Sequence, residues 1–158
     1  MKRKLYSFLS LICTFVISAV LLCGCSLLGR ETSSSASESI VQEATVKASV
    51  LEKTGTMVVI KVEKAEEDTT LMDIMDLLKA SGELDFKVVS GMVSELNGVA
   101  NPADYSSCWM LYTSDAEMSN TAWGTVEYNG MAMGSAILGA DTLTVIANAY
   151  YVWSFQSF

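Results

Sequence analysis

The stretch that decides the fold is "TTLMDIMDLLKASGEL", residues 69–84, which predicts the one clear helix of the chain. Thr70 and Asp73 stand three residues apart in the spacing of a capping box, which starts a helix. Gly82 follows the apolar run and is a typical helix C-terminal stop. The apolar residues that helical spacing places on a single face are Leu71, Ile74, Met75, Leu77 and Leu78.

The segments on both sides of this helix have the patterns of β-strands. Before it, two β-rich runs surround Lys53-Thr54-Gly55, as in a hairpin. After it, Asn129-Gly130 stands between alternating residues and is the strongest hairpin turn, and Asn97-Gly98 is a second turn. Alternation over residues 142–149 predicts the last strand. The tail 149–158 is compatible with either a further strand or an apolar plug. The fold class expected is α+β, β-grasp-like, with the helix on one face of a curved sheet.

The N-terminus has the pattern of an export signal. The basic start "MKRK" precedes an apolar run over residues 5–22, which is also near the length of a membrane helix. Leu22-Cys23-Gly24-Cys25 resembles the lipobox of bacterial lipoproteins, in which the last cysteine is acylated after cleavage. We therefore expect a signal peptide at 1–24, a lipidated Cys25 with a serine-rich disordered linker at 25–43, and one domain at 44–158. The expected location is the extracytoplasmic face of the membrane, with the lipid anchor as the membrane partner.

Composition excludes several classes of function. The chain has 158 residues and a net charge of −8, and without Lys2, Arg3 and Lys4 it has seven basic against 18 acidic residues. Such an acidic chain offers no electrostatic footprint for nucleic acid. The absence of histidine removes the usual general base and the usual metal ligand. We therefore expect no enzyme activity, no metal and no cofactor. Cys108 is expected to be an unreactive thiol, because no basic group lies beside it in the sequence.

Aromatic residues are the main candidates for a ligand surface, because flat rings stack on flat ligands and on sugars. Strand alternation around "CWMLY" points Trp109 and Leu111 to one face and Cys108, Met110 and Tyr112 to the other, with Trp109 favoured as core. The polar segment "SDAEMSNTAWGT" is expected to be a loop that exposes its tryptophan. Met92 and Met131 are expected to fill gaps in the core. The candidate ligand-binding residues are Trp123, Tyr112, Tyr150, Trp153 and Trp109.

Residues 69–151 contain an ordered series of motifs: "TTLMDIMDLL", "FKVVSGMVSELNGVA", "SSCWMLYTS", "VEYNGMAMGSAIL" and "LGADTLTVIANAY". This series resembles the C-terminal domain of the cobalamin carriers transcobalamin and intrinsic factor, which also occurs in bacterial surface proteins. In place of the usual Gly-Asp before the last strand, this chain has Gly139-Ala140-Asp141. The resemblance implies a binding module on the cell surface, for a corrinoid or another flat small ligand. The alternative is a structural or adhesive module that binds protein or glycan at the cell envelope.

Overall fold

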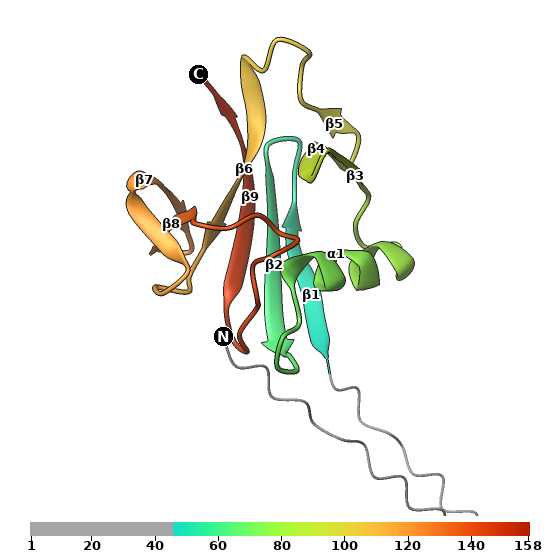
Figure 1. Ribbon diagram of the computed structural model, residues 1–158, viewed down its shortest axis with the longest axis vertical. Coiled ribbons are helices and arrows are strands. Elements are labelled where there is room, and N and C mark those ends of the chain that lie inside the picture. Colours follow the sequence, from blue (N-terminus) through green and yellow to red (C-terminus); the bar gives the residue numbers. More distant parts are fainter. Residues whose placement is uncertain (1–45) are drawn as a thin grey trace, which may run out of the picture. The chain divides into compact units, whose positions relative to one another are not determined.

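The computed structural model describes residues 46–158, which all belong to one compact unit (Figure 1). These residues form nine strands and one helix. In chain order the elements are β1 (Lys47–Lys53), β2 (Met57–Lys64), α1 (Leu71–Ala80), β3 (Phe86–Val89), β4 (Met92–Leu96), β5 (Val99–Ala100), β6 (Ser107–Thr113), β7 (Ser119–Tyr128), β8 (Met131–Ala136) and β9 (Tyr150–Ser157). The prediction of an α+β fold is confirmed at this level.

The strands form two antiparallel sheets. The main sheet has six strands in the order β1-β2-β9-β6-β8-β7, and β3, β4 and β5 form a separate small sheet. In Figure 1, α1 lies beside the β1–β2 hairpin, while β7 and β8 lie at the other end of the main sheet. The main sheet is strongly curled. The rings of Tyr128 on β7 and Tyr150 on β9 have centroids only 6.2 Å apart, although two strands, β6 and β8, stand between β7 and β9 in the sheet.

The helix begins as predicted. The Thr70 hydroxyl accepts a hydrogen bond from the Asp73 N–H (3.2 Å), and the Asp73 carboxylate accepts one from the Thr70 N–H (2.8 Å). Ser81 caps the C-terminus, and Gly82 follows in the left-handed region with φ of 80°. The prediction that Leu77 shares a face with the other four apolar residues is wrong, because Leu77 is 54% exposed whereas those four are buried. With about 100° between successive residues, it lies well to the side of the stripe formed by the four buried residues.

The predicted turns also form where the sequence places them. Tyr128 pairs with Met131 across Asn129-Gly130, whose φ angles of 51° and 76° are those of a tight turn with two left-handed residues. Asn97-Gly98 joins β4 to β5 with φ angles of 47° and 83°. These turns are confirmed because asparagine and glycine tolerate positive φ better than other residues do.

The prediction for the last strand is wrong in its position. The strand is Tyr150–Ser157, and it lies inside the main sheet between β2 and β6 rather than at residues 142–149. Asn148, with φ of 65°, turns the chain just before it. The tail is therefore a central strand, in which Tyr151, Val152 and Trp153 are buried.

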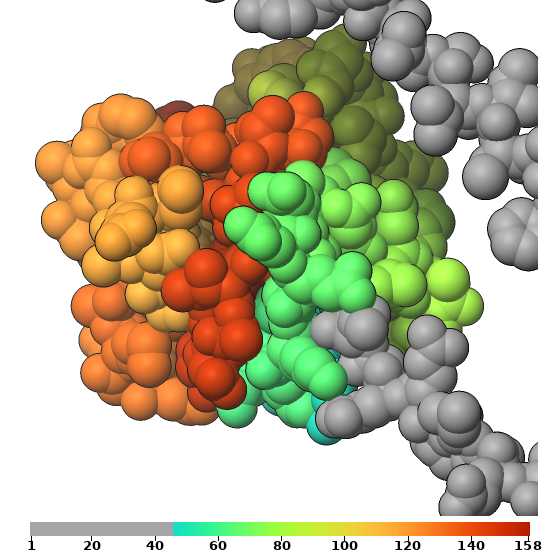
Figure 2. Space-filling model, turned by 60° about the horizontal axis from the view of Figure 1, so that its bottom comes forward, coloured from blue at the N-terminus to red at the C-terminus, as the bar shows by residue number. Residues whose placement is uncertain are grey.

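Residues 140–145 instead contact the start of α1. The Leu71 N–H donates to the Leu143 carbonyl, and the Met72 N–H donates to the Ala140 carbonyl, each at 2.8 Å. The first N–H groups of a helix have no acceptor within the helix, so this segment satisfies them. Figure 2 shows the segment, in red, running beside the start of the helix, in green.

The core occupies both faces of the main sheet. Leu111, Trp153 and Val58 stand opposite one another on β6, β9 and β2, so their side chains share a face. On this face they pack with the buried residues of α1, the small sheet and residues 140–149. The opposite face carries a smaller cluster of Val59, Tyr112, Met133 and Val152.

The predictions about the N-terminal region lie outside the described residues. They comprise the apolar run 5–22, the acylation of Cys25 and the linker up to residue 43. Of residues 46–158, no helix has the length and apolar character needed to cross a bilayer.

Candidate functional site

A small apolar cavity of about 220 Å³ lies between β4, β6 and the segment 139–140. Its walls come from residues 91–93, 108–111 and 139–140, together with Asn101, Tyr105 and Trp153. These segments are far apart in the sequence and meet because β4 packs near β6 and residues 139–140 pack against the start of α1.

Two tryptophans line the cavity, and their indole N–H groups differ. The Nε1–H of Trp109 donates to the Val99 carbonyl at 2.8 Å, and its ring meets Phe155 edge-on with centroids 5.2 Å apart. The Nε1 atom of Trp153 is buried and has no hydrogen-bond partner. Both tryptophans are almost fully buried, and they contribute mainly carbon atoms to the wall of the cavity.

The cavity lies along a part of β6 that has a neighbouring strand on one side only. β9 pairs with all of residues 107–113, whereas β8 pairs only with Tyr112 and Thr113. On the open side, the Trp109 N–H donates to Asn101 Oδ1 at 3.1 Å. The Nδ2 group of Asn101 donates to the Val93 carbonyl at 3.2 Å, so this side chain joins β6 to β4 beside the cavity.

The rim of the cavity is apolar and exposed. Met92 is 56% exposed and Tyr105 is 59% exposed. Val89, which pairs with Met92 across the hairpin, adds a further exposed apolar side chain. The prediction that Met92 fills the core is therefore wrong. It stands just after the tight turn Ser90-Gly91, where a short hairpin has too few neighbours to bury both faces.

Tyr105 is held at the rim by a local turn. Its N–H donates to the Pro102 carbonyl at 3.0 Å, and its φ of 52° is unusual for an aromatic residue. Beside it, Asp104 Oδ1 accepts hydrogen bonds from the Ser106 N–H (3.1 Å) and hydroxyl (2.9 Å). These bonds stabilise the charged form and lower the pKa of Asp104.

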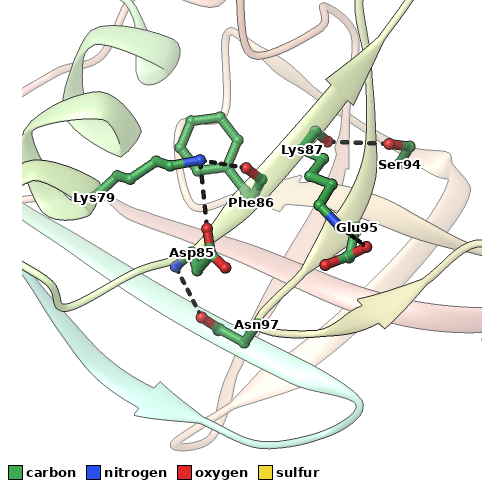
Figure 3. A network of polar contacts seen from close by, with 7 residues as sticks. All are labelled: Lys79, Asp85, Phe86, Lys87, Ser94, Glu95 and Asn97. Atoms are coloured by element: carbon green, nitrogen blue, oxygen red, sulfur yellow. Dashed lines mark hydrogen bonds and ion pairs between the residues drawn. The ribbon is translucent and has the colours of Figure 1, made fainter.

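A polar network holds the small sheet, and with it the β4 wall of the cavity, to the end of the helix (Figure 3). Lys79 Nζ donates to the Phe86 carbonyl at 2.6 Å, pairs with Asp85 at 3.3 Å and lies over the Phe86 ring. The Asp85 N–H donates to Asn97 Oδ1 at 3.0 Å. Lys87 and Glu95 form an ion pair across β3 and β4 at 2.7 Å.

The five aromatic candidates from the sequence do not form one surface. Only Trp109 and Trp153 line the cavity. Tyr112 is buried in the cluster on the opposite face, and Tyr150 packs against that cluster. Trp123 is 63% exposed as expected, but it lies inside strand β7 rather than in a loop. An irregularity in the β7–β8 pairing between Asn120 and Thr125 leaves it without a partner in register.

Sequence reasoning missed Tyr105 and Met92 as rim residues. The signal for Tyr105 was present in "NPADY", since asparagine, proline and aspartate mark a turn that carries an aromatic residue. No comparable signal marks Met92. Met131 was also expected in the core and is exposed, because it directly follows the Asn129-Gly130 turn.

Cys108 has the features of an unreactive thiol. Burial raises its pKa above the usual value for a cysteine. Its Sγ donates to Met110 Sδ at 3.6 Å. A raised pKa leaves little thiolate at neutral pH, and the thiolate is the reactive form.

The chemistry that this arrangement supports is the binding of an apolar group. Among residues 46–158, no three histidine, cysteine, aspartate or glutamate side chains come together as metal ligands do. The walls of the cavity provide aromatic and aliphatic carbon, with polar groups at Asn101 and Tyr105. Comparison with known proteins gives no match, since no family model, no curated protein and no solved structure is significantly similar to this chain.

Proposed function

We propose that this chain is a non-catalytic binding module, anchored by lipid to the extracytoplasmic face of a bacterial membrane, that takes a small ligand in the cavity beside Trp109. The observation that carries the proposal is an apolar cavity with an exposed apolar rim at Met92 and Tyr105. Contiguous exposed apolar patches often mark ligand or partner sites, and the exposed Val89 side chain extends this one beside Met92. The domain proposed to carry this function is residues 44–158.

The proposed localisation at the membrane depends on the lipidation of Cys25. Lipidation is supported by the basic start, the apolar run and the sequence Leu22-Cys23-Gly24-Cys25. In cells given radiolabelled palmitate, the wild-type chain is expected to incorporate label and to sediment with membranes. Cys25→Ala is expected to lose the label, whereas Cys23→Ala, the matched control two residues earlier, keeps it. Labelling of the Cys25→Ala chain would refute the proposal.

The finer fold that we propose is β-grasp-like, as in the C-terminal domain of transcobalamin and intrinsic factor. The order of a hairpin, one helix and then further strands supports it, as does the final strand β9 beside the first hairpin. An experimental structure of the domain, compared with those carriers, tests this assignment.

The ligand class proposed is a corrinoid or another flat small molecule. Pockets that enclose a drug-sized ligand measure about 300–1,000 Å³, so a cavity of about 220 Å³ takes only part of a corrinoid. The ring would lie across the mouth against Tyr105 and Met92, with one substituent inside. This ligand class is tested by isothermal titration calorimetry, in which cobalamin or cobinamide is added to the full chain in detergent micelles. Flat calorimetric traces would remove corrinoids.

A second candidate function is adhesion to a protein or glycan of the envelope. The observation that favours it is Trp123, which is 63% exposed on the edge strand β7. An exposed tryptophan offers a large rigid surface to a sugar face or a protein. Binding to isolated envelope fractions that is lost in Trp123→Ala, and retained in Tyr105→Leu, would favour adhesion over the cavity function.

A further inference from the structure

The charges of the domain are distributed unevenly along the chain. From residue 88 to residue 158 there is no lysine or arginine. The same stretch has six acidic residues, namely Glu95, Asp104, Asp115, Glu117, Glu127 and Asp141. All residues that line the cavity belong to this stretch. The nearest lysine in the sequence, Lys87, is paired with Glu95 at 2.7 Å.

This distribution decides the sign of the charge that the cavity accepts. A cleft whose surroundings carry one sign of charge concentrates ligands of the opposite sign. An anionic ligand such as a phosphate or a carboxylate would meet repulsion and no cationic partner from any of the lining segments. A cationic ligand would meet attraction.

Two acidic side chains stand beside the lining residues. A Cβ atom placed on Gly139, which lines the cavity, would lie only 2.9 Å from Asp141 Oδ1. The Asp141 carboxylate therefore lies close to Gly139, which belongs to this wall. Asp104 adjoins Tyr105 at the rim and is held there by Ser106.

The remaining chemistry of the cavity is aromatic. Tyr105, Trp109 and Trp153 all contribute to its walls. The Trp109 N–H is already used by the Val99 carbonyl, so that ring offers the cavity no free hydrogen-bond donor. Aromatic surfaces attract cations, and quaternary ammonium groups are the ligands that aromatic cages typically recognise.

We propose that the cavity binds a small alkylammonium cation, of the trimethylammonium type, as a free small molecule. Methyl groups match the apolar walls, and a quaternary nitrogen needs no hydrogen-bond acceptor from them. A fully hydrated ammonium or metal ion would lose its water without compensation in such walls. This inference rests on the proposed function of the cavity as the ligand site and names the class of ligand.

The test uses the full chain in nonionic detergent micelles, with binding followed by calorimetry and by tryptophan fluorescence. Choline is compared with 3,3-dimethylbutan-1-ol, which has the same shape and no charge. Choline is expected to bind about tenfold more tightly, which corresponds to the usual strength of a cation–π contact with nearby carboxylates. Potassium chloride at the same ionic strength is expected to leave the fluorescence unchanged.

Variants separate the contributions of ring and charge. Tyr105→Leu keeps an exposed apolar side chain and is expected to weaken choline binding about fivefold. Asp141→Asn and Asp104→Asn are each expected to weaken choline binding about threefold while leaving the uncharged isostere unaffected. Glu127→Gln, on β7 and not among the lining residues, is the matched control and is expected to change neither ligand.

The same cation can be carried by a methylated lysine of a partner protein. A peptide with one trimethyllysine is expected to bind no more tightly than choline, and tenfold tighter peptide binding would overturn the assignment to a small molecule. Equal affinities for choline and its uncharged isostere would overturn the proposal of a cationic ligand. Binding of corrinoids but not of choline would do the same, and either result would leave the proposed binding function intact. If no ligand binds the folded chain, both fail.

Discussion

Asn101 Oδ1 accepts a hydrogen bond from the backbone N–H of Trp109 at 3.1 Å, on the side of β6 where β8 does not reach this residue. An asparagine side chain has the same acceptor and donor as a peptide group, so it can take the place of one residue of a neighbouring strand. The Nδ2 group of Asn101 acts as the peptide N–H of such a strand would, because it donates to the Val93 carbonyl. One side chain thus closes the edge of the sheet and ties together two walls of the cavity.

Removal of this side chain should destabilise the domain measurably. Asn101→Ala leaves the N–H of Trp109 and the carbonyl of Val93 without these partners, so we expect the free energy of unfolding to fall by about 1–3 kcal/mol. Urea denaturation measures it, and hydrogen exchange of the Trp109 amide should accelerate. Asn120→Ala, which removes only a local bond to the Ala122 N–H, is the control and should cost less than about 0.5 kcal/mol. Equal losses in the two variants would contradict the role of Asn101.

The two buried tryptophans should respond differently to replacement by phenylalanine. Trp109→Phe loses a hydrogen bond to the Val99 carbonyl, whereas Trp153→Phe removes an N–H that has no partner. Both variants lose similar ring volume, so we expect Trp109→Phe to be less stable by about 1–2 kcal/mol. Thermal and urea denaturation of the pair measure this difference. Trp153→Phe emerging as the less stable variant would show that its N–H has a partner.

The capping box predicts a dependence of stability on pH. The Thr70 hydroxyl and N–H bind the Asp73 carboxylate and lower the pKa of that group below its usual value. A depressed pKa contributes stability above the unfolded value of about 3.9, and this stability is lost as pH falls through the folded pKa. The difference in the free energy of unfolding between wild type and Asp73→Ala should therefore be present at pH 7 and shrink below about pH 4. Asp76→Ala, on the same helix and outside the capping box, is the matched control for the loss of a helix carboxylate.

The Lys79 network should matter for the small sheet more than an exposed ion pair does. Lys79→Met loses the bond to the Phe86 carbonyl and the pairing with Asp85, and we expect a loss of about 1 kcal/mol. The amides of β3 should exchange faster, because this strand is then held less firmly to α1. Lys47→Met, which removes an exposed pair with Glu63, is the control and should leave stability almost unchanged. An unchanged exchange rate on β3 in Lys79→Met would show that packing alone holds it.

Local features were predictable from the sequence because local interactions produce them. The helix start at Thr70 depends on a residue three positions away, and the Asn129-Gly130 turn depends on the positive φ of two adjacent residues. The alternation around Trp109 was also correct, because the side chains of a strand alternate whatever its neighbours are. The prediction for Leu77 was wrong because the spacing of apolar residues does not determine how wide the buried stripe of a helix is.

The sequence by itself determined the helix, its caps, the hairpin turns, the excess of acidic residues and the absence of histidine. Only the tertiary structure decided that β9, rather than residues 142–149, enters the sheet, and that residues 140–143 cap the start of α1. It also decided that Trp109, Trp153 and Tyr105 meet at one cavity while Tyr112 and Trp123 do not. The physical reason is that pairing between distant strands is chosen by the total apolar surface that the whole chain buries, and no short window of sequence contains that sum.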